Sequence, residues 1–353
     1  MAALFEVSHL TVGYGYEGEE PVQAVQDLSF TVEPGEVVGI AGESGCGKST
    51  LALAATGLLD PPGRVSSGTV RFDGEDLLSL SPEALRRLRL RHLSLVFQAS
   101  MNVLNPVLRI RDQFFDAMEA HGVTSRREAL ERTHAVFDMV KVPRRFVDAY
   151  PHQLSGGMRQ RAVIALSLVL EPRLVFMDEP TTALDVVVQR AILQSVNDLR
   201  ERRGFSVVFI THDLSLLVEI ADRIVIMYAG FLVEEAAGQE LYERPLHPYT
   251  RALMRAFPPL GEVRTRLEGI PGQPPDLRRL PPGCPFYPRC KERLYGVCDE
   301  GLPPVMWVSP GHRVRCHLYP GEGERDGKTD GTGDGKGKGG GHGGSGTGDG
   351  QPE

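Results

Sequence analysis

The fold of this chain is decided by the run Gly42-Glu43-Ser44-Gly45-Cys46-Gly47-Lys48-Ser49-Thr50, which matches the phosphate-loop (P-loop) pattern G-x-x-x-x-G-K-[ST]. It follows the apolar run Val37 to Ala41 and precedes the helical pattern of Leu51 to Leu59. A glycine loop between a strand and a helix presents backbone N–H groups and a helix N-terminus to an anion. We therefore expect nucleotide phosphates here, with Lys48 at the β and γ phosphates and Ser49 on Mg²⁺.

The remaining residues of this loop are expected to allow its backbone to curve around the phosphates. Glycine is expected where a Cβ would keep the backbone from wrapping the phosphates. Cys46 has no general base near it in the sequence, and we interpret it as a small filler rather than a nucleophile. The predicted nucleotide contacts in the loop are Gly42, Ser44, Gly45, Cys46, Gly47, Lys48, Ser49 and Thr50.

A second apolar run, Leu174 to Met177, ends in the acidic pair Asp178-Glu179. Near-continuous apolar strands alternating with helical stretches indicate a parallel sheet covered on both faces, and ligands bind at the carboxyl edge of such sheets. We expect Asp178 to hold the Mg²⁺ shell. Glu179 is then the candidate that orients and polarises the attacking water, which typically contributes ~10²–10⁴-fold in rate.

A third strand, Val207 to Ile210, ends in Thr211-His212-Asp213. In a parallel sheet His212 then projects from the same edge as the P-loop and the acidic pair. Its imidazole is placed to hydrogen-bond the γ phosphate and the carboxylate that carries the water. The sequence therefore predicts three strand ends that converge on one phosphate.

Composition limits the class of protein. The chain has 353 residues, 41% hydrophobic content, a formal net charge of -7 and a pI near 5.9, which argues against nucleic acid as the main partner. Apolar runs such as Ala162 to Leu170 are shorter than the ~20 residues that cross a bilayer, and no signal sequence opens the chain. We expect a cytosolic protein whose association with a membrane depends on other proteins.

The run Leu154-Ser155-Gly156-Gly157-Met158-Arg159-Gln160-Arg161 resembles the LSGGQ-like signature of the ABC ATPase family. Ser155, Gly156 and Gly157 at the start of a helix make a second anion site. The resemblance implies that the P-loop of one subunit faces the signature of its partner, with two ATP molecules between them in a head-to-tail dimer. Because the chain holds a single P-loop, it needs a second ATPase subunit.

Further motifs of that family occur in the expected order. Gln98, after the strand Leu93 to Phe97, is similar to the glutamine that senses Mg²⁺ and water and connects to the membrane subunit. Asp185 ends a run similar to the D-loop. Tyr14 is the candidate for stacking on adenine, with Tyr16 close behind.

The wider motifs look like those of the oligopeptide and dipeptide importer ATPases. They are Pro151–Arg161, Asp178–Val186, Leu104–Val107 and Pro245–Thr250. The resemblance implies two transmembrane permeases, an extracytoplasmic substrate-binding protein and a paralogous second ATPase, at the cytoplasmic face of the membrane. The run 99–103 departs from the family, and relatives carry nickel or oligosaccharides, so these cargoes stay open. A soluble, non-transport ABC ATPase is the rival from another class, although the chain has neither a second cassette nor a long coiled-coil insertion.

Four of the five cysteines lie close together near the C-terminus, at Cys284, Cys290, Cys298 and Cys316. Disulfides are not expected in a reducing compartment. Structural zinc usually takes cysteine pairs two to four residues apart, and no such pair occurs among these four. Their spacing is compatible with a [4Fe–4S] cluster, and the family's C-terminal extension has a similar pattern. Zinc and plain buried thiols are the alternatives.

These expectations describe an α/β protein: a P-loop NTPase (RecA-like) ABC nucleotide-binding domain with an antiparallel β subdomain and a helical insertion, plus a small C-terminal domain. We expect the ATPase domain at 1–255, with its helical subdomain at about 99–160, and the cysteine-containing domain at 256–320. Residues 321–353 are rich in glycine and are predicted to be a disordered tail.

Overall fold

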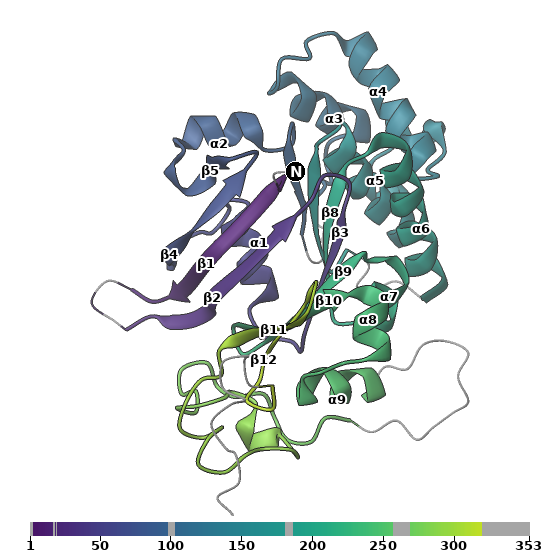
Figure 1. Cartoon of the computed structure of the whole chain (residues 1–353). Helices are drawn as coiled ribbons and strands as arrows, with labels where there is room; N and C mark the ends of the chain where they lie inside the picture. Colours follow the sequence, from purple (N-terminus) through teal and green to yellow (C-terminus); the bar gives the residue numbers. More distant parts are fainter. Residues whose placement is uncertain are drawn as a thin grey trace, which may run out of the picture. The chain divides into compact units, whose positions relative to one another are not determined.

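A mixed sheet and an antiparallel sheet organise the chain (Figure 1). The computed structural model describes residues 3–16, 18, 20–97, 103–180, 186–256 and 269–319. Within these ranges, an eight-stranded sheet has the order β11-β12-β10-β9-β3-β8-β7-β6, and a four-stranded sheet has the order β2-β1-β4-β5. The predicted tail at 321–353 lies outside the described residues.

The strands and helices have the following bounds. The strands are β1 (Phe5–Tyr14), β2 (Val22–Val32), β3 (Val37–Ala41), β4 (Gly63–Phe72), β5 (Glu75–Asp76), β6 (Leu93–Val96), β7 (Leu174–Asp178), β8 (Ser206–Thr211), β9 (Arg223–Tyr228), β10 (Phe231–Ala237), β11 (Val305–Ser309) and β12 (His312–Arg315). The helices are α1 (Lys48–Ala55), α2 (Pro82–Leu88), α3 (Ile110–Glu119), α4 (Arg126–Met139), α5 (Gly156–Leu168), α6 (Val186–Arg203), α7 (Leu214–Ile220), α8 (Gly238–Glu243) and α9 (Pro248–Ala256).

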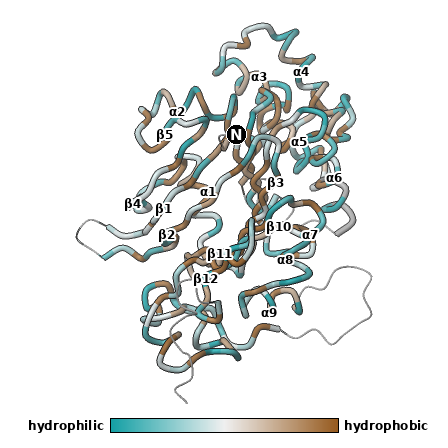
Figure 2. The backbone as a smooth tube through the Cα atoms, in the orientation of Figure 1, coloured by the Kyte–Doolittle hydropathy of each residue, from teal (hydrophilic) through white to brown (hydrophobic). Residues whose placement is uncertain are grey.

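The centre of the large sheet is parallel, as predicted. Strand β3 pairs in parallel with β8 and β9, and β7 pairs in parallel with β8 and β6. Every residue of β3, β7 and β8 is buried, which explains why these strands are almost entirely apolar. Figure 2 shows the hydrophobic residues concentrated around β3.

The four-stranded sheet is the predicted antiparallel subdomain. Strand β1 pairs antiparallel with both β2 and β4. Its apolar face packs against the large sheet, where the ring of Phe5 meets that of Phe176 edge-on, with centroids 5.4 Å apart. The P-loop and α1 follow β3, so this contact fixes the β subdomain beside the loop.

Helices α3 and α4 lie between β6 and β7 in the sequence and form the predicted helical insertion (Figure 1). Ser125 caps α4 by accepting a hydrogen bond from the Glu128 N–H. The two helices pack through Phe114 and Phe137, whose rings meet edge-on at 5.6 Å. The insertion leads through short 3₁₀ turns into α5, which starts at the signature run.

The C-terminal segment extends the large sheet. Strand β12 pairs antiparallel with β10, and β11 pairs with β12. Arg313 pairs with Glu235 on β10, and its guanidinium also donates to the Ser29 carbonyl on β2. Met1–Tyr319 group into one compact unit. The predicted division between 255 and 256 stays a prediction, because the segment 257–268 lies outside the described residues.

None of the helices in the described part of the chain combines the length and the apolar character that a membrane crossing requires.

A buried histidine joins the C-terminal hairpin to the core and predicts a pH effect on stability. The His312 ring nitrogens lie 2.8 Å from a Glu234 carboxylate oxygen and 3.0 Å from one of Glu240. Burial disfavours the charged ring, but the bonds to both carboxylates outweigh it and raise the pKa of His312 above its usual 6.5. The stabilisation is therefore complete below about pH 6.5 and is lost as pH rises through the raised pKa.

We expect His312→Gln to lower the free energy of unfolding by about 1–3 kcal/mol at about pH 5.5, and by less at about pH 9. Denaturant unfolding at both pH values measures this, with the exposed His152→Gln as the matched control. A loss that is independent of pH would show that the charge on His312 does not stabilise the fold.

Candidate functional site

The three predicted strand ends meet at one edge of the large sheet. Strand β8 lies between β3 and β7. Ala41, the last residue of β3, pairs with Thr211, and Asp178 pairs with Ile210. The P-loop, the acidic pair and His212 therefore leave adjacent strands at the same level, as the sequence predicted.

The P-loop folds around its own lysine. The Lys48 Nζ donates to the Gly42 carbonyl at 2.8 Å and to the Glu43 carbonyl at 3.0 Å. The side chain is buried, with 6% exposed, and α1 begins at Lys48 behind an N-cap at Gly47. This arrangement places one ammonium and the N-terminus of a helix at the same concave loop, which suits a polyphosphate.

Two glycines of the loop are required by the core as well as by the loop itself. A Cβ on Gly42 would lie 2.2 Å from the Met227 carbonyl oxygen, and one on Gly47 would lie 2.1 Å from that of Ala24. Gly47 also has φ +104, in the region that favours glycine. The loop is thus held against the backbone of β9 and β2, a constraint that the sequence pattern alone does not indicate.

Cys46 points into the interior, with 5% of the residue exposed. Burial raises the pKa of its thiol, against the opposing effect of Lys48. A buried, protonated thiol is a poor nucleophile, in agreement with its interpretation as a small filler.

Ser49 and Asp178 come together where Mg²⁺ was predicted. The Ser49 hydroxyl hydrogen-bonds the Asp178 carboxylate, whose pKa is raised by burial, lowered by this bond, and raised again by the charge of Glu179. The Asp178 Oδ1 is buried and has no hydrogen-bond partner. A buried carboxylate oxygen with unused lone pairs beside a hydroxyl is a donor set that fits Mg²⁺.

Glu179 and His212 form a pair next to this set. The His212 Nδ1 lies 3.2 Å from the Glu179 Oε1. Only 14% of the glutamate side chain is exposed, compared with 56% of the imidazole. Glu179 adopts φ +44, the left-handed region, and its N–H donates to the Ile210 carbonyl. This turn directs the carboxylate back toward β8 and its histidine.

Tyr14 lies beside the end of the P-loop. Its hydroxyl is 3.2 Å from the Thr50 Oγ1, which joins the end of β1 to α1. Tyr16 is 69% exposed. Tyr14 therefore lies beside the loop, and its stacking on adenine stays a prediction.

The signature run forms the predicted helix start. Ser155 is the N-cap of α5, and its hydroxyl accepts from the Met158 N–H at 3.3 Å. Ser155 and Gly156 are exposed. The buried Gln160, which sequence reasoning did not select, donates to the Pro180 carbonyl directly after the acidic pair. The helix that starts at the signature run thus contacts, through Gln160, the residue that follows Asp178 and Glu179.

Two predicted site residues, Gln98 and Asp185, lie outside the described residues. Their roles stay predictions.

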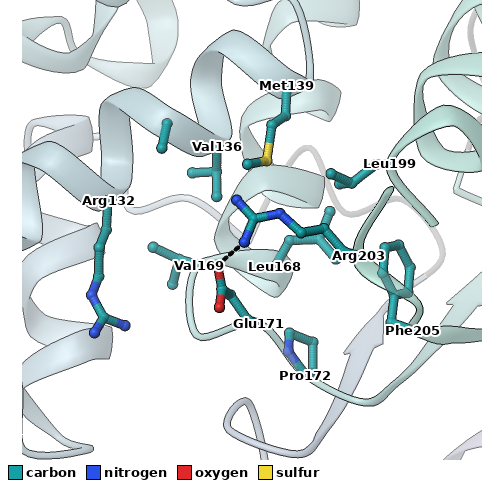
Figure 3. Close-up of a pocket in the computed structure, with 11 residues that line it drawn as sticks. Arg132, Val136, Met139, Leu168, Val169, Glu171, Pro172, Leu199, Arg203 and Phe205 are labelled. Carbon is teal, nitrogen blue, oxygen red and sulfur yellow. Dashed lines mark hydrogen bonds and ion pairs between the residues drawn. The ribbon is translucent and has the colours of Figure 1, made fainter. Parts of the chain in front are cut away.

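A cavity of about 460 Å³ lies away from this site, between the helical insertion and the core (Figure 3). Apolar side chains of α4, α5 and α6 contribute to its walls, together with Arg132 and the ion pair between Arg203 and Glu171. It contains none of the predicted nucleotide contacts.

The four C-terminal cysteines lie in one region, with Cys290, Cys298 and Cys316 buried and Cys284 half-buried. Burial, together with the charges of the other cysteines, raises the pKa of Cys316 to about 12. Burial also raises the pKa of Cys284 to about 11. In the part of the chain that the structure covers, no three or more His, Cys, Asp or Glu side chains are arranged to hold a metal ion. This finding does not support the predicted [4Fe–4S] cluster or the zinc alternative.

The structure also brings to the P-loop two residues that the sequence did not indicate. Arg289, next to Cys290, pairs with Glu43 of the P-loop, and the Tyr249 hydroxyl accepts the Glu43 N–H. Both residues lie far from the P-loop in the sequence, and although Tyr249 falls within the motif Pro245–Thr250, no motif indicates that either residue contacts Glu43.

Comparisons with known families and proteins agree with this geometry. A family model for the ABC transporter matches residues 25–182, and one for the oligopeptide/dipeptide transporter C-terminal region matches residues 233–298. Among solved structures, the dimeric MJ0796, a bacterial ABC transporter cassette, has a TM-score of 0.59 and 30% identity, covering 66% of this chain and 98% of its own.

Similar proteins match over most of the chain. The probable peptide ABC transporter ATP-binding protein y4tR of Sinorhizobium fredii is 44% identical over 85% of this chain and 91% of its own length. The oligopeptide transport ATP-binding protein OppD of Salmonella typhimurium is 41% identical over 89% of this chain and 93% of its own. The chain therefore belongs to the ATP-hydrolysing, ATP-binding proteins of ABC transporters, in the branch with the oligopeptide/dipeptide transporter C-terminal region.

Proposed function

We propose that this chain energises the import of oligopeptides or dipeptides by binding and hydrolysing ATP at the cytoplasmic face of the cell membrane. The observation that carries the ATPase part is the meeting of Lys48, Asp178 and Glu179 at one sheet edge. The peptide cargo is supported by the match to the oligopeptide/dipeptide transporter C-terminal region and by relatives named for peptide transport. Nickel and oligosaccharides are the alternative cargoes.

In this proposal each described residue has one task. Lys48 leaves the loop carbonyls to bind the β and γ phosphates, and Tyr14 packs on the adenine. Ser49 and Asp178 would hold Mg²⁺, and the ion would supply positive charge that offsets the charge of the phosphates. Glu179 orients a water molecule and accepts its proton as the water oxygen bonds to the γ phosphorus and the bond to ADP breaks. His212 holds Glu179 in position.

The second half of each nucleotide site comes from another ATPase subunit. Ser155 and Gly156 are exposed at the start of α5, with the half-buried Gly157 next to them, which supports contact with the nucleotide on the partner's P-loop. The dimeric structure of a similar cassette supports the pairing of two ATPase subunits. Gln98 is proposed to sense Mg²⁺ and water and to connect the site to the permeases, and Asp185 of the D-loop is proposed to contact the nucleotide.

We further propose that two transmembrane permeases and an extracytoplasmic binding protein complete the importer, and that the second ATPase is a paralogue. Purification of the tagged chain from detergent-solubilised membranes tests this assembly. We expect two polytopic membrane proteins and one further ATPase to copurify, and the reconstituted complex to hydrolyse ATP faster when the binding protein carries peptide. Full ATPase activity in a monomer that binds no membrane protein would contradict the proposal.

A [4Fe–4S] cluster on Cys284, Cys290, Cys298 and Cys316 stays a prediction that rests on the residue types. Bound as a cluster, the four thiols would be deprotonated ligands with a structural role. Iron analysis after anaerobic purification tests it, with about four irons per chain expected. Bound zinc, or no metal in protein that folds normally, would contradict it.

A further inference from the structure

One buried arginine connects the C-terminal segment to the phosphate loop. Arg289 donates from Nη1 and Nη2 to the two carboxylate oxygens of Glu43, at 2.6 and 3.0 Å. Only 5% of the arginine side chain is exposed, and 23% of the glutamate. Paired bonds of this kind are the strongest and most directional that a guanidinium makes with a carboxylate.

The surroundings of Arg289 hold it in this position. Its Nε donates to the Pro271 carbonyl at 2.8 Å, and its Nη1 to the Tyr228 hydroxyl at 3.2 Å. The guanidinium also lies 5.9 Å from the ring centre of Phe286. Burial disfavours its charge, but the bond to Glu43 outweighs burial and raises the pKa of Arg289. Arg289 is therefore a fixed cation.

Glu43 is held from a second direction as well. Its N–H donates to the Tyr249 hydroxyl on α9 at 2.8 Å, and its carbonyl accepts from the Lys48 Nζ at 3.0 Å. Tyr249 is fully buried against Tyr228, with ring centres 4.6 Å apart. One residue of the loop thus contacts α9, the C-terminal segment and the lysine assigned to the phosphates.

The negative charge of Glu43 opposes the binding of phosphates to this loop. The loop is built to bind a polyanion, and a carboxylate within it repels the phosphates unless a cation compensates it. Because Arg289 is buried, solvent screens the compensation less than it screens a surface pair. Fixing the carboxylate also fixes the backbone that presents the N–H groups.

We propose that Arg289 is a positioning residue for nucleotide binding, through which the C-terminal segment 269–319 sets the ATP affinity of the P-loop. It does so by neutralising the Glu43 carboxylate and holding it in place. This inference rests on the assignment of the P-loop as the ATP site.

Binding of a non-hydrolysable ATP analogue with Mg²⁺ to the full chain, measured by calorimetry, tests the proposal. We expect Arg289→Met to weaken binding about tenfold, because it leaves Glu43 uncompensated beside the phosphates. Adding Glu43→Gln in the same chain removes the repulsion and is expected to restore affinity to within about threefold of the wild type. Arg293→Met is the matched control and should bind as the wild type does, because this half-buried arginine of the same segment bonds to Tyr295 and not to Glu43.

Recovery in the double variant separates this role from a merely structural one, because removal of Glu43 cannot restore the anchoring of the segment. A double variant as weak as Arg289→Met, or wild-type affinity in Arg289→Met, would overturn the proposal. Should Arg289→Met fail to fold, Arg289→Gln with and without Glu43→Gln makes the same comparison, because the amide keeps hydrogen-bond donors but removes the charge. Loss of binding in Lys48→Met shows in parallel that the P-loop is the ATP site.

Discussion

Glu179→Gln is expected to lower the rate of ATP hydrolysis of the assembled transporter by about 10²- to 10⁴-fold, with ATP binding retained. The amide keeps the shape of the side chain and a contact to His212, but it cannot accept the proton of the attacking water. The carboxylate lies at the sheet edge 3.2 Å from His212, beside the Ser49 and Asp178 pair. Phosphate release at saturating ATP measures the effect.

Glu131→Gln is the matched control for this variant, since Glu131 is an exposed residue of α4 paired with Arg127. Its hydrolysis rate should equal that of the wild type. A Glu179→Gln transporter that hydrolyses ATP within about threefold of the wild-type rate would exclude Glu179 as the general base.

Lys48→Met is expected to weaken the binding of Mg²⁺ and ATP by about 100-fold. The ammonium is buried, and its bonds to the Gly42 and Glu43 carbonyls hold it at the concave side of the loop. Methionine fills the same space but supplies neither the charge nor the hydrogen bonds. Titration calorimetry with a non-hydrolysable analogue measures the loss of affinity.

The exposed Lys291→Met is the control for removal of one lysine charge. The melting temperature without nucleotide must be recorded for both variants, because Lys48 also satisfies two loop carbonyls. Wild-type affinity in a folded Lys48→Met protein would show that ATP binds elsewhere.

Much of the fold follows from local sequence patterns. Strands β3 and β7 are buried on both faces, so their apolar runs are continuous and their ends are marked by glycine or acidic residues. The signature helix starts where Ser155 can cap it. Since adjacent parallel strands end at one edge, the meeting of Asp178, Glu179 and His212 with the P-loop was predictable as well.

The parts that were not predictable depend on contacts between distant segments. Strands β11 and β12 are short, and nothing in their sequence indicates that β12 pairs with β10 or that β11 pairs with β12. Arg289 and Glu43 are 246 residues apart, and only the folded chain brings them together. The close packing of Gly42 against the Met227 carbonyl likewise joins two segments that lie far apart in the sequence.

The most direct test of the account is the mass of the Glu179→Gln chain in sedimentation, mixed with its companion ATPase, with and without Mg²⁺ and ATP. If two nucleotides are held between the P-loop of each subunit and the signature of the other, a stable dimer forms only with ATP. A Ser155→Arg substitution should abolish this dimer. A Glu179→Gln chain that binds ATP and remains a monomer in that mixture would contradict the account.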